Sequence, residues 1–292
     1  MAQPRLECAL EARNRLGEGP IWDCRDNRLY WVDIRAPALL SFDSASGKTA
    51  QWPMPEVISC AVPRASGGFL LALQSGLHGF DPETGTLSPI LDPEPDKPAN
   101  RLNDGKCDRQ GRFWVGTMRD GSPAPDGALY RIDADRRCRR VLAEIHVPNS
   151  IAWSPDGTIF YFADTRVDTI WAFACDPATG SLGSQRIFAG PGSAPGRPDG
   201  ATVDEAGCLW SARYGGSTVV RFTPEGRVDR IVELPVSQVT SCAFGGPRLD
   251  TLFVTTAAMN LPPAQAAAEP LAGGLFAIDV GARGLAEASF AG

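Results

Sequence analysis

The chain has 292 residues, of which 43% are hydrophobic and 21% charged, and its formal net charge is −6. An acidic balance argues against a nucleic-acid partner, which would require a basic surface. The basic run DRRCRR at 135–140 is expected to be a solvated hairpin loop. No stretch approaches the length of a membrane span, and the N-terminus has no apolar core of signal-peptide length. We therefore expect no membrane partner and a cytoplasmic protein.

A unit that recurs six times dominates the sequence. In each unit a polar residue opens an apolar run, which then turns back through Gly, Asp and Pro. The openers are Glu18, Ser59, Asn103, Asn149, Asp199 and Thr240. Their spacings are 41, 44, 46, 50 and 41 residues, about the length of one four-stranded propeller blade.

Two further strand-like segments follow each opener. The second segments are RLYWVDI, GGFLLALQ, GRFWVGTM, TIFYFADT, GCLWSARY and DTLFVTTA, and the third are ALLSFD, GLHGFD, GALYRID, TIWAFACD, STVVRFT and GGLFAID. Turn signals such as DPETG, SPDG and TPEG separate them. At about 40 to 50 residues per blade, residues 1–292 form one closed ring of six and leave no room for a second domain. We predict an all-β fold, a single six-bladed β-propeller of four-stranded antiparallel blades, with a turn or two of helix in 261–271.

Blades of a propeller are related by rotation, so their innermost strands begin at equivalent points around one end of a central channel. Glu18, Asn103, Asn149 and Asp199 occupy that point in four blades and are expected to converge on one small cavity. Taken singly, Glu18, Asn149 and Asp199 fit ordinary turns in GEGP, VPNS and RPDG. Their shared position favours a site instead. Two carboxylates and an amide oxygen suit Ca²⁺, Mg²⁺ or Mn²⁺, with Zn²⁺ or Fe²⁺ tolerated, and three ligands leave open positions as in a catalytic centre.

Histidine and cysteine usage narrows the chemistry further. Only His78 and His146 are present, which excludes a His-rich zinc site and argues against a Ser-His-Asp triad. His78 is expected inside a strand, whereas His146 is a candidate for the cavity rim. The eight cysteines form no Cys-x-x-Cys and are expected to be free, mostly buried thiols. Cys60 and Cys242 could approach the channel but lack an activating histidine.

The sequence SGKT at 46–49 resembles part of a phosphate-binding loop. That motif requires a glycine five residues before its second glycine, where this chain has Phe42. We therefore expect a hairpin turn and no nucleotide cofactor.

Several longer motifs occur in a fixed order from about Glu11 to Asp279. They are RLGEGPIW, RLNDGKCD with GRFWVGTM, PNSIAWSPDG, RPDGATVDEAG with GCLW, and TSCAFGG with LFVTTA. As a set they resemble the regucalcin (senescence marker protein)–gluconolactonase family. Within that family they are most similar in character to the bacterial sugar-acid lactonases. The resemblance implies a six-bladed propeller that hydrolyses a sugar lactone with one divalent cation. It also implies that Glu18, Asn149 and Asp199 are metal ligands, that Asp199 is the general base, and that Arg101 and Asn103 bind the sugar.

One segment departs from the family pattern. Mammalian relatives carry a sugar-contacting Glu after GTM, whereas this chain reads GTMRDGSPAPDG, and Asp120 is our candidate for the same role with a shorter reach. Arg213 in SARYGG stands where many relatives have a neutral residue, and we assign it no role. The Gly- and Pro-rich loops 119–127 and 190–198 are expected to decide which sugar is accepted.

The expected chemistry is ester hydrolysis. The cation would polarise the lactone carbonyl and stabilise the oxyanion, Asp199 would take a proton from the attacking water, and Arg101 and Asn103 would orient the ring hydroxyls. Two other classes of function stay open. A propeller protein-interaction platform needs no converging carboxylates. A non-catalytic calcium-binding, regucalcin-like protein would keep Glu18, Asn149 and Asp199 but could dispense with Arg101 and Asn103. The particular sugar, the native metal and the oligomeric state are not predicted.

Overall fold

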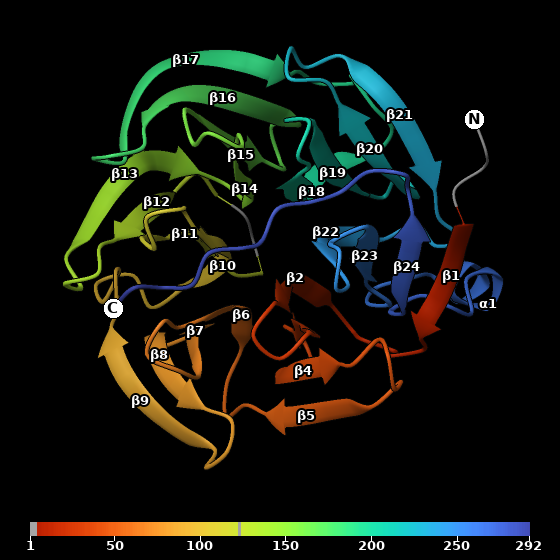
Figure 1. Ribbon diagram of the computed structural model, residues 1–292, viewed down its shortest axis with the longest axis horizontal. Helices are drawn as coiled ribbons and strands as arrows, with labels where there is room; N and C mark the ends of the chain where they lie inside the picture. The colour runs from red at the N-terminus through yellow and green to blue at the C-terminus, as the bar shows by residue number, and fades with distance from the viewer. Residues whose placement is uncertain (1–4, 122–123) are drawn as a thin grey trace.

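The computed structural model describes residues 5–121 and 124–292. Its strands form six antiparallel sheets of four strands each, arranged around a central axis as a β-propeller (Figure 1). The predicted fold class and the number of blades are therefore confirmed. The Ala-rich stretch contains one short helix, α1 (Pro263–Ala268), as expected. No described helix has the length and apolar character required to cross a membrane.

The first three blades follow the chain without interruption, from the innermost strand outward. Blade 1 comprises β2 (Gly17–Asp23), β3 (Arg28–Asp33), β4 (Ala38–Phe42) and β5 (Thr49–Pro53). Blade 2 comprises β6 (Ile58–Pro63), β7 (Phe69–Leu73), β8 (Gly76–Asp81) and β9 (Thr86–Leu91). Blade 3 comprises β10 (Asn100–Cys107), β11 (Phe113–Arg119), β12 (Gly127–Ile132) and β13 (Cys138–Ile145).

The next two blades repeat this order, and the sixth differs. Blade 4 comprises β14 (Pro148–Trp153), β15 (Ile159–Asp164), β16 (Thr169–Asp176) and β17 (Ser181–Ala189). Blade 5 comprises β18 (Arg197–Val203), β19 (Leu209–Tyr214), β20 (Thr218–Phe222) and β21 (Val228–Glu233). Blade 6 comprises β22 (Val239–Gly245), β23 (Thr251–Thr256), β24 (Leu275–Asp279) and, as its outer strand, β1 (Arg5–Leu10).

The pairing of β1 with β24 closes the ring. Arg5 lies opposite Asp279 and Glu7 opposite Ala277, so the first strand of the chain completes the last blade. This closure joins the first and last described strands by backbone hydrogen bonds. The repeat analysis did not identify it, because the segment RLECAL carries none of the repeated motifs.

A recurring turn explains why the strands end where they do. In the turn after β10, the Asp108 carboxylate accepts a hydrogen bond from Trp114 Nε1 at 2.9 Å, and Asp204 accepts the same bond from Trp210 after β18. The glycine of each turn has a positive φ, 77° at Gly111 and 81° at Gly207, which favours glycine over other residues. The aspartate thus ties each turn to a buried tryptophan of the next strand.

The core lies between the blades and not at the axis. One cluster joins the first three blades through residues such as Val32, Leu71 and Phe113, and another joins blades 5 and 6 through Trp210 and Val254. Each pair of neighbouring sheets therefore buries apolar faces against one another, which leaves the centre of the ring for polar side chains.

The C-terminal segment after β24 runs across the ring at the end of the channel where the innermost strands finish (Figure 1). Gly284 forms a bridge with Asp204 of blade 5, and Phe290 forms one with Arg64 of blade 2. Phe290 is fully buried, and Arg64 donates hydrogen bonds to the Gly292 carbonyl. The tail therefore spans the channel from one side of the ring to the other.

Smaller expectations have mixed outcomes. SGKT lies in the hairpin between β4 and β5, and His78 lies half-buried in β8, both as predicted. All eight cysteines are free, and five of them are buried. The basic run 135–140 is not wholly a loop, because Cys138 begins β13 and the two arginines after it lie in that exposed outer strand.

Candidate active site

Each innermost strand is irregular just after the point where it begins. The pairing register shifts between Glu18 and Ile21 in β2 and between Asn149 and Ala152 in β14. Corresponding shifts occur in β6, β10, β18 and β22. A bulge of this kind bends a strand and re-aims its side chains. Because it recurs in all six inner strands, the blades can direct the opening residues toward a common centre.

The six residues predicted to bind metal or sugar all line one cavity at this end of the channel, which has a volume of about 380 Å³. The site residues in its wall are Glu18, Arg101, Asn103, Asp120, Asn149 and Asp199. The remaining walls include Leu16, Ile34, Arg35, Met118, Val147, Thr165, Tyr214, Met259 and Asn260. The cavity is large enough for a monosaccharide-sized molecule and combines a polar floor with partly apolar sides.

Two acidic side chains in the cavity lack a cationic partner. Neither Glu18 nor Asp199 forms an ion pair or accepts a side-chain hydrogen bond within residues 5–121 and 124–292; Glu18 Oε2 accepts only the backbone N–H of Gly19, at 3.1 Å. Burial and the neighbouring Asp104 carboxylate raise the pKa of Glu18. Burial and the Glu18 carboxylate raise the pKa of Asp199 well above its usual value. The two groups therefore repel each other when both are ionised.

Asn149 is held with its amide oxygen toward Asn103. Its Nδ2 donates to Thr165 Oγ1 at 2.8 Å, and its Oδ1 accepts from Asn103 Nδ2 at 3.3 Å. Thr165 in turn donates to the Pro198 carbonyl at 2.7 Å, one residue before Asp199. The hydroxyl of Thr165 thus links blades 4 and 5 and orients an oxygen donor beside the two carboxylates.

Arg101 and Asn103 lie together in β10. Arg101 Nη1 donates to Asn103 Oδ1 at 2.8 Å and to the Leu102 carbonyl at 2.9 Å. Asn103 also donates to the Pro148 carbonyl of blade 4 at 2.9 Å. Burial lowers the pKa of Arg101, although the nearby Asp120 carboxylate opposes that effect. Arg101 is 5% exposed, so it is a rigid part of the cavity wall.

Asp120 is shared by two arginines. Arg35 Nη1 donates to its Oδ2 at 2.9 Å, and Arg101 Nε donates to its Oδ1 at 3.0 Å. The hydrogen bonds of Arg35, followed by the charge of Arg101, hold the pKa of Asp120 well below its usual value. Asp120 lines the cavity as expected, and its carboxylate bridges blades 1 and 3. The rest of its loop includes residues 122 and 123, which lie outside the described residues.

The donor set fits a divalent cation. Asp199 is buried and Glu18 half-buried, the two carboxylates repel each other, and a cation between them would offset charge that the protein leaves unbalanced. Asn149 adds an oriented amide oxygen, so the set contains only oxygen ligands. The described residues contain no group of three or more His, Cys, Asp or Glu arranged to hold a metal ion. The predicted trio has two such residues and one amide, and its role as a metal site stays a prediction.

Other singled-out residues lie elsewhere. His146 Nδ1 lies 3.0 Å from Asp164 Oδ2, beside the cavity residue Val147. Cys60 is buried, and its burial, followed by the Asp104 and Glu18 charges, raises the pKa of its thiol well above the usual value. Burial raises the pKa of Cys242 to about 12. Both thiols are thus kept protonated and poorly nucleophilic.

Arg213 does not line the cavity. It is 1% exposed and pairs with Asp168 at 3.2 Å. It also donates to the Pro195 carbonyl at 3.0 Å and the Gly196 carbonyl at 2.9 Å. Arg213 therefore fastens the Gly- and Pro-rich loop 190–198 to blade 5.

Sequence reasoning missed Arg35 and Thr165. Each follows an aspartate that ends the second strand of its blade, Asp33 in VDIR and Asp164 in ADTR. Those aspartates accept backbone hydrogen bonds from the same pair of positions in blades 1 and 4, from Arg15 and Arg35 N–H and from His146 and Arg166 N–H. These bonds make Arg35 equivalent to Arg166 and Thr165 equivalent to Ile34, so a comparison of the two strand ends would have drawn attention to the two positions after each aspartate.

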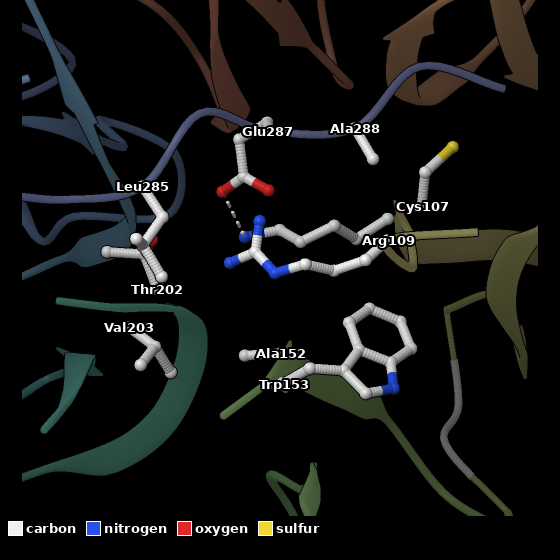
Figure 2. A pocket seen from close by; sticks show the side chains of 10 residues that line it. Cys107, Arg109, Ala152, Trp153, Thr202, Val203, Leu285, Glu287 and Ala288 are labelled. Carbon is white, nitrogen blue, oxygen red and sulfur yellow. Dashed lines mark hydrogen bonds and ion pairs between the residues drawn. The ribbon is translucent and has the colours of Figure 1, made fainter. Parts of the chain in front are cut away.

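The other end of the channel is closed by the C-terminal segment. Lys106 Nζ donates to Glu287 Oε1 and to the Ala201 carbonyl, each at 3.1 Å. Although burial opposes the charged form of Lys106, Glu287 and Asp104 raise its pKa. Figure 2 shows Glu287 and Ala288 of the tail on one side of a small cavity, with Arg109 and Trp153 facing them. That cavity has a volume of only about 30 Å³.

Comparison with known proteins identifies a family and relatives that agree with the fold described above. Residues 16–258 fit the model of the SMP-30/Gluconolactonase/LRE-like region. The chain is 38% identical to a 6-deoxy-6-sulfogluconolactonase of Pseudomonas putida, over 98% of this chain and 99% of that one. It is also 38% identical to an L-arabinolactonase of Azospirillum brasilense, over 97% of this chain and 94% of that one.

A solved structure supports the same relationship. The chain is similar to the crystal structure of a calcium-binding protein, regucalcin, from Agrobacterium tumefaciens, with a TM-score of 0.94 and 31% identity over 99% of each chain. The family resemblance predicted from the motifs is thus confirmed. With its matching propeller, its cavity at the inner-strand ends and full-length similarity to these relatives, the chain belongs to the SMP-30/gluconolactonase/LRE-like family.

Proposed function

We propose that this protein hydrolyses a sugar lactone to the corresponding aldonic acid in the cavity between Glu18, Arg101 and Asp199. The observation that carries the proposal is the pair of carboxylates that form no ion pair, Asp199 buried and Glu18 half-buried, in one monosaccharide-sized cavity with ordered arginine and asparagine donors. Two relatives support it, because the names 6-deoxy-6-sulfogluconolactonase and L-arabinolactonase describe enzymes that act on sugar lactones. Both are similar to this protein over nearly the whole chain.

Glu18, Asn149 and Asp199 are the residues that would hold one divalent cation. When bound, the cation supplies a Lewis acid that polarises the lactone carbonyl. The relative described as a calcium-binding regucalcin supports a cation in this family, and the identity of the ion is left open.

Asp199 is the general base of the proposal. Its carboxylate lies in the cavity and accepts no side-chain hydrogen bond within the described residues, so one oxygen is available to take a proton from water. The water oxygen adds to the lactone carbonyl carbon, and the bond from that carbon to the ring oxygen then breaks. The ring oxygen leaves as a hydroxyl after it receives the proton that Asp199 took from the water, which gives the open-chain acid and restores the carboxylate.

Arg101 and Asn103 hold the substrate. Their donors are fixed by the bond between Arg101 Nη1 and Asn103 Oδ1 and by burial of the guanidinium. Sugar hydroxyls are recognised by such convergent donors, which orient the carbonyl for attack. Asp120 acts in this arrangement through its ion pair with Arg101, besides any contact of its own with the sugar.

The alternative is a calcium-binding protein without catalysis, which the regucalcin relative keeps open. Such a protein requires Glu18, Asn149 and Asp199 but has no use for the network around Arg101 and Asp120. The rigid organisation of that network favours the enzyme. Nothing comparable favours a protein-interaction platform.

Metal removal tests the proposal. Protein treated with EDTA and desalted should hydrolyse none of a panel of pentono- and hexonolactones, and Ca²⁺, Mn²⁺ or Zn²⁺ should restore acid release. Each ion should also raise the melting temperature of the metal-free protein, because it binds the folded state. A rise in melting temperature without acid release from any lactone would favour the calcium-binding alternative, and full activity in metal-free protein would contradict the metal site.

A further inference from the structure

The rim of the cavity carries arginines that have no carboxylate partner. Three exposed arginines lie one or two residues along the chain from a cavity-lining residue: Arg15, Arg166 and Arg197. In the part of the chain that the structure describes, none of the three forms an ion pair. Other arginines of the described residues, among them Arg227, also lack an ion pair, so it is the position beside the cavity that distinguishes these three.

These arginines lie on opposite sides of the ring, at positions that the fold fixes. Asp33 and Asp164 end equivalent strands of blades 1 and 4, which face each other across a six-bladed ring. Asp33 fixes the backbone of Arg15 and Arg35, and Asp164 fixes that of Arg166. Both aspartates are buried at 3% exposure, and their oxygens accept hydrogen bonds from backbone N–H groups besides one side-chain contact each, with Asn14 Nδ2 and with His146 Nδ1. Asp33 and Asp164 therefore position the backbone of the arginines, while their own carboxylates stay buried away from the solvent.

A second excess of positive charge lies inside the cavity. Arg35 and Arg101 share the single carboxylate of Asp120, which leaves one positive charge unbalanced in that group of three. Arg101 Nη2 has no acceptor among the described residues, whereas its Nε and Nη1 are both engaged. The opposite acids, Glu18 and Asp199, are the proposed cation ligands, so the cation would offset their charge.

We propose that the substrate is an acidic sugar lactone, one that bears a carboxylate or sulfonate in addition to the lactone ring, and that this anion is drawn in by the rim arginines and held beside Arg35 and Arg101. The inference rests on the proposed lactonase function and names its substrate class. A neutral lactone would gain nothing from unpaired guanidinium groups at the entrance. An anion is attracted by them over several ångströms and is bound by forked donors that match its oxygens.

A matched pair of substrates tests the inference. D-Glucono-1,4-lactone and D-glucaro-1,4-lactone share the ring and differ by a hydroxymethyl group against a carboxylate at C6. The enzyme, saturated with divalent cation, should show a kcat/KM for the acidic lactone that is about 10-fold or more above that for the neutral one at low ionic strength. The ratio should fall as ionic strength rises from about 0.01 to 1 M, because salt screens exposed charges. A 6-deoxy-6-sulfo analogue assayed alongside distinguishes a carboxylate from a sulfonate.

Substitutions locate the effect. The triple variant Arg15→Gln, Arg166→Gln, Arg197→Gln should lower the ratio of the two kcat/KM values about 10-fold and flatten its salt dependence. Arg227→Gln removes the same charge at the opposite end of blade 5, in the hairpin between β20 and β21, and should leave the ratio unchanged. The salt dependence of the unmodified enzyme needs no variant, so the test survives poor folding of the triple variant.

The outcomes separate the two proposals. Hydrolysis of both lactones with a ratio near one that does not respond to salt would overturn the acidic-substrate inference and leave the lactonase proposal standing. Hydrolysis of neither lactone, nor of the sulfo analogue or any pentonolactone, would overturn both.

Discussion

The two ends of the central channel handle buried charge in opposite ways. At the far end, Lys106 is paired with Glu287, and the C-terminal segment covers the pair. At the cavity end, neither Glu18 nor Asp199 forms an ion pair within the described residues, and although the Arg101 charge acts on both, burial and neighbouring carboxylates still raise the pKa of each. A buried charge with a partner stabilises the fold or is close to neutral, whereas unpaired like charges reduce stability. The cavity end therefore gives up stability where a ligand can restore it.

The largest expected effect comes from the cavity end. Asp199→Asn should lower kcat more than about 1,000-fold, because it removes both the proposed base and a negative ligand. The melting temperature of the metal-free variant should equal or exceed that of the parent, since one of two repelling carboxylates is gone. Asp96→Asn, the same change at an exposed and unpaired aspartate, serves as the control. A variant that keeps a tenth of the parent kcat at saturating metal would remove Asp199 from the role of base.

Arg101→Ala should have the next largest effect and should separate sugar binding from metal binding. We expect kcat/KM to fall about 10- to 1,000-fold, the loss that corresponds to roughly 1.4–4 kcal/mol of oriented hydrogen bonding. Metal affinity, measured by calorimetry, should change little, because a guanidinium does not coordinate a cation. Arg101→Lys retains the charge without the forked donors and should recover only part of the activity. Loss of metal binding in Arg101→Ala would show that the two tasks are not divided in this way.

At the far end the expected effects reverse. Glu287→Gln should destabilise the protein by about 1–3 kcal/mol, because it leaves the Lys106 ammonium without its carboxylate, and both side chains are largely buried. Activity per folded molecule should be unchanged at temperatures below the transition. The control is Glu205→Gln, an exposed glutamate on the same end of the ring. The contrast between the two ends would disappear if Glu287→Gln reduced kcat as strongly as it reduced the melting temperature.

A pH dependence of stability is also expected in the metal-free protein, where no substitution is made. The pKa of Glu18 is raised from its ordinary value of 4.5 to about 8, and that of Asp199 is also raised. For carboxyl groups with raised folded-state pKa values, the unfolded chain releases the protons first, so stability falls as the pH rises between about 4.5 and 8. A saturating divalent cation should flatten this decline, because it favours the ionised carboxylates. Thermal unfolding across this range, with and without cation, measures both slopes.

The fold could be predicted from the sequence because its information is local and repeated. The six openers, Glu18, Asn149 and Asp199 among them, recur at spacings of 41 to 50 residues, and each is followed by strand and turn signals that a four-stranded blade requires. Rotation about the axis then brings the openers into one cavity, and the structure places them there. Their roles in metal binding and catalysis stay predictions.

The contacts that the sequence did not reveal are those without a period. Arg35 and Asp120 lie 85 residues apart in blades 1 and 3, and no repeated motif relates them. Lys106 and Glu287 lie 181 residues apart, and the tail that carries Glu287 belongs to no blade. Such pairs depend on how side chains meet across the finished ring, which strand patterns do not encode.

The closing of blade 6 by β1 has a consequence for how the protein is made. On the ribosome, the residues of β1 emerge before those of the other described strands, but their partner β24 is synthesised after all of them. Blades 1 to 5 can form in order as the chain lengthens. Strand β1 has no partner strand until β24 has been synthesised. Its exposed edge is then a target for pairing with neighbouring chains. A newly made chain is therefore most prone to mispairing with its neighbours before β24 has been synthesised. Chaperones that bind extended segments near β1 would protect it most at that stage.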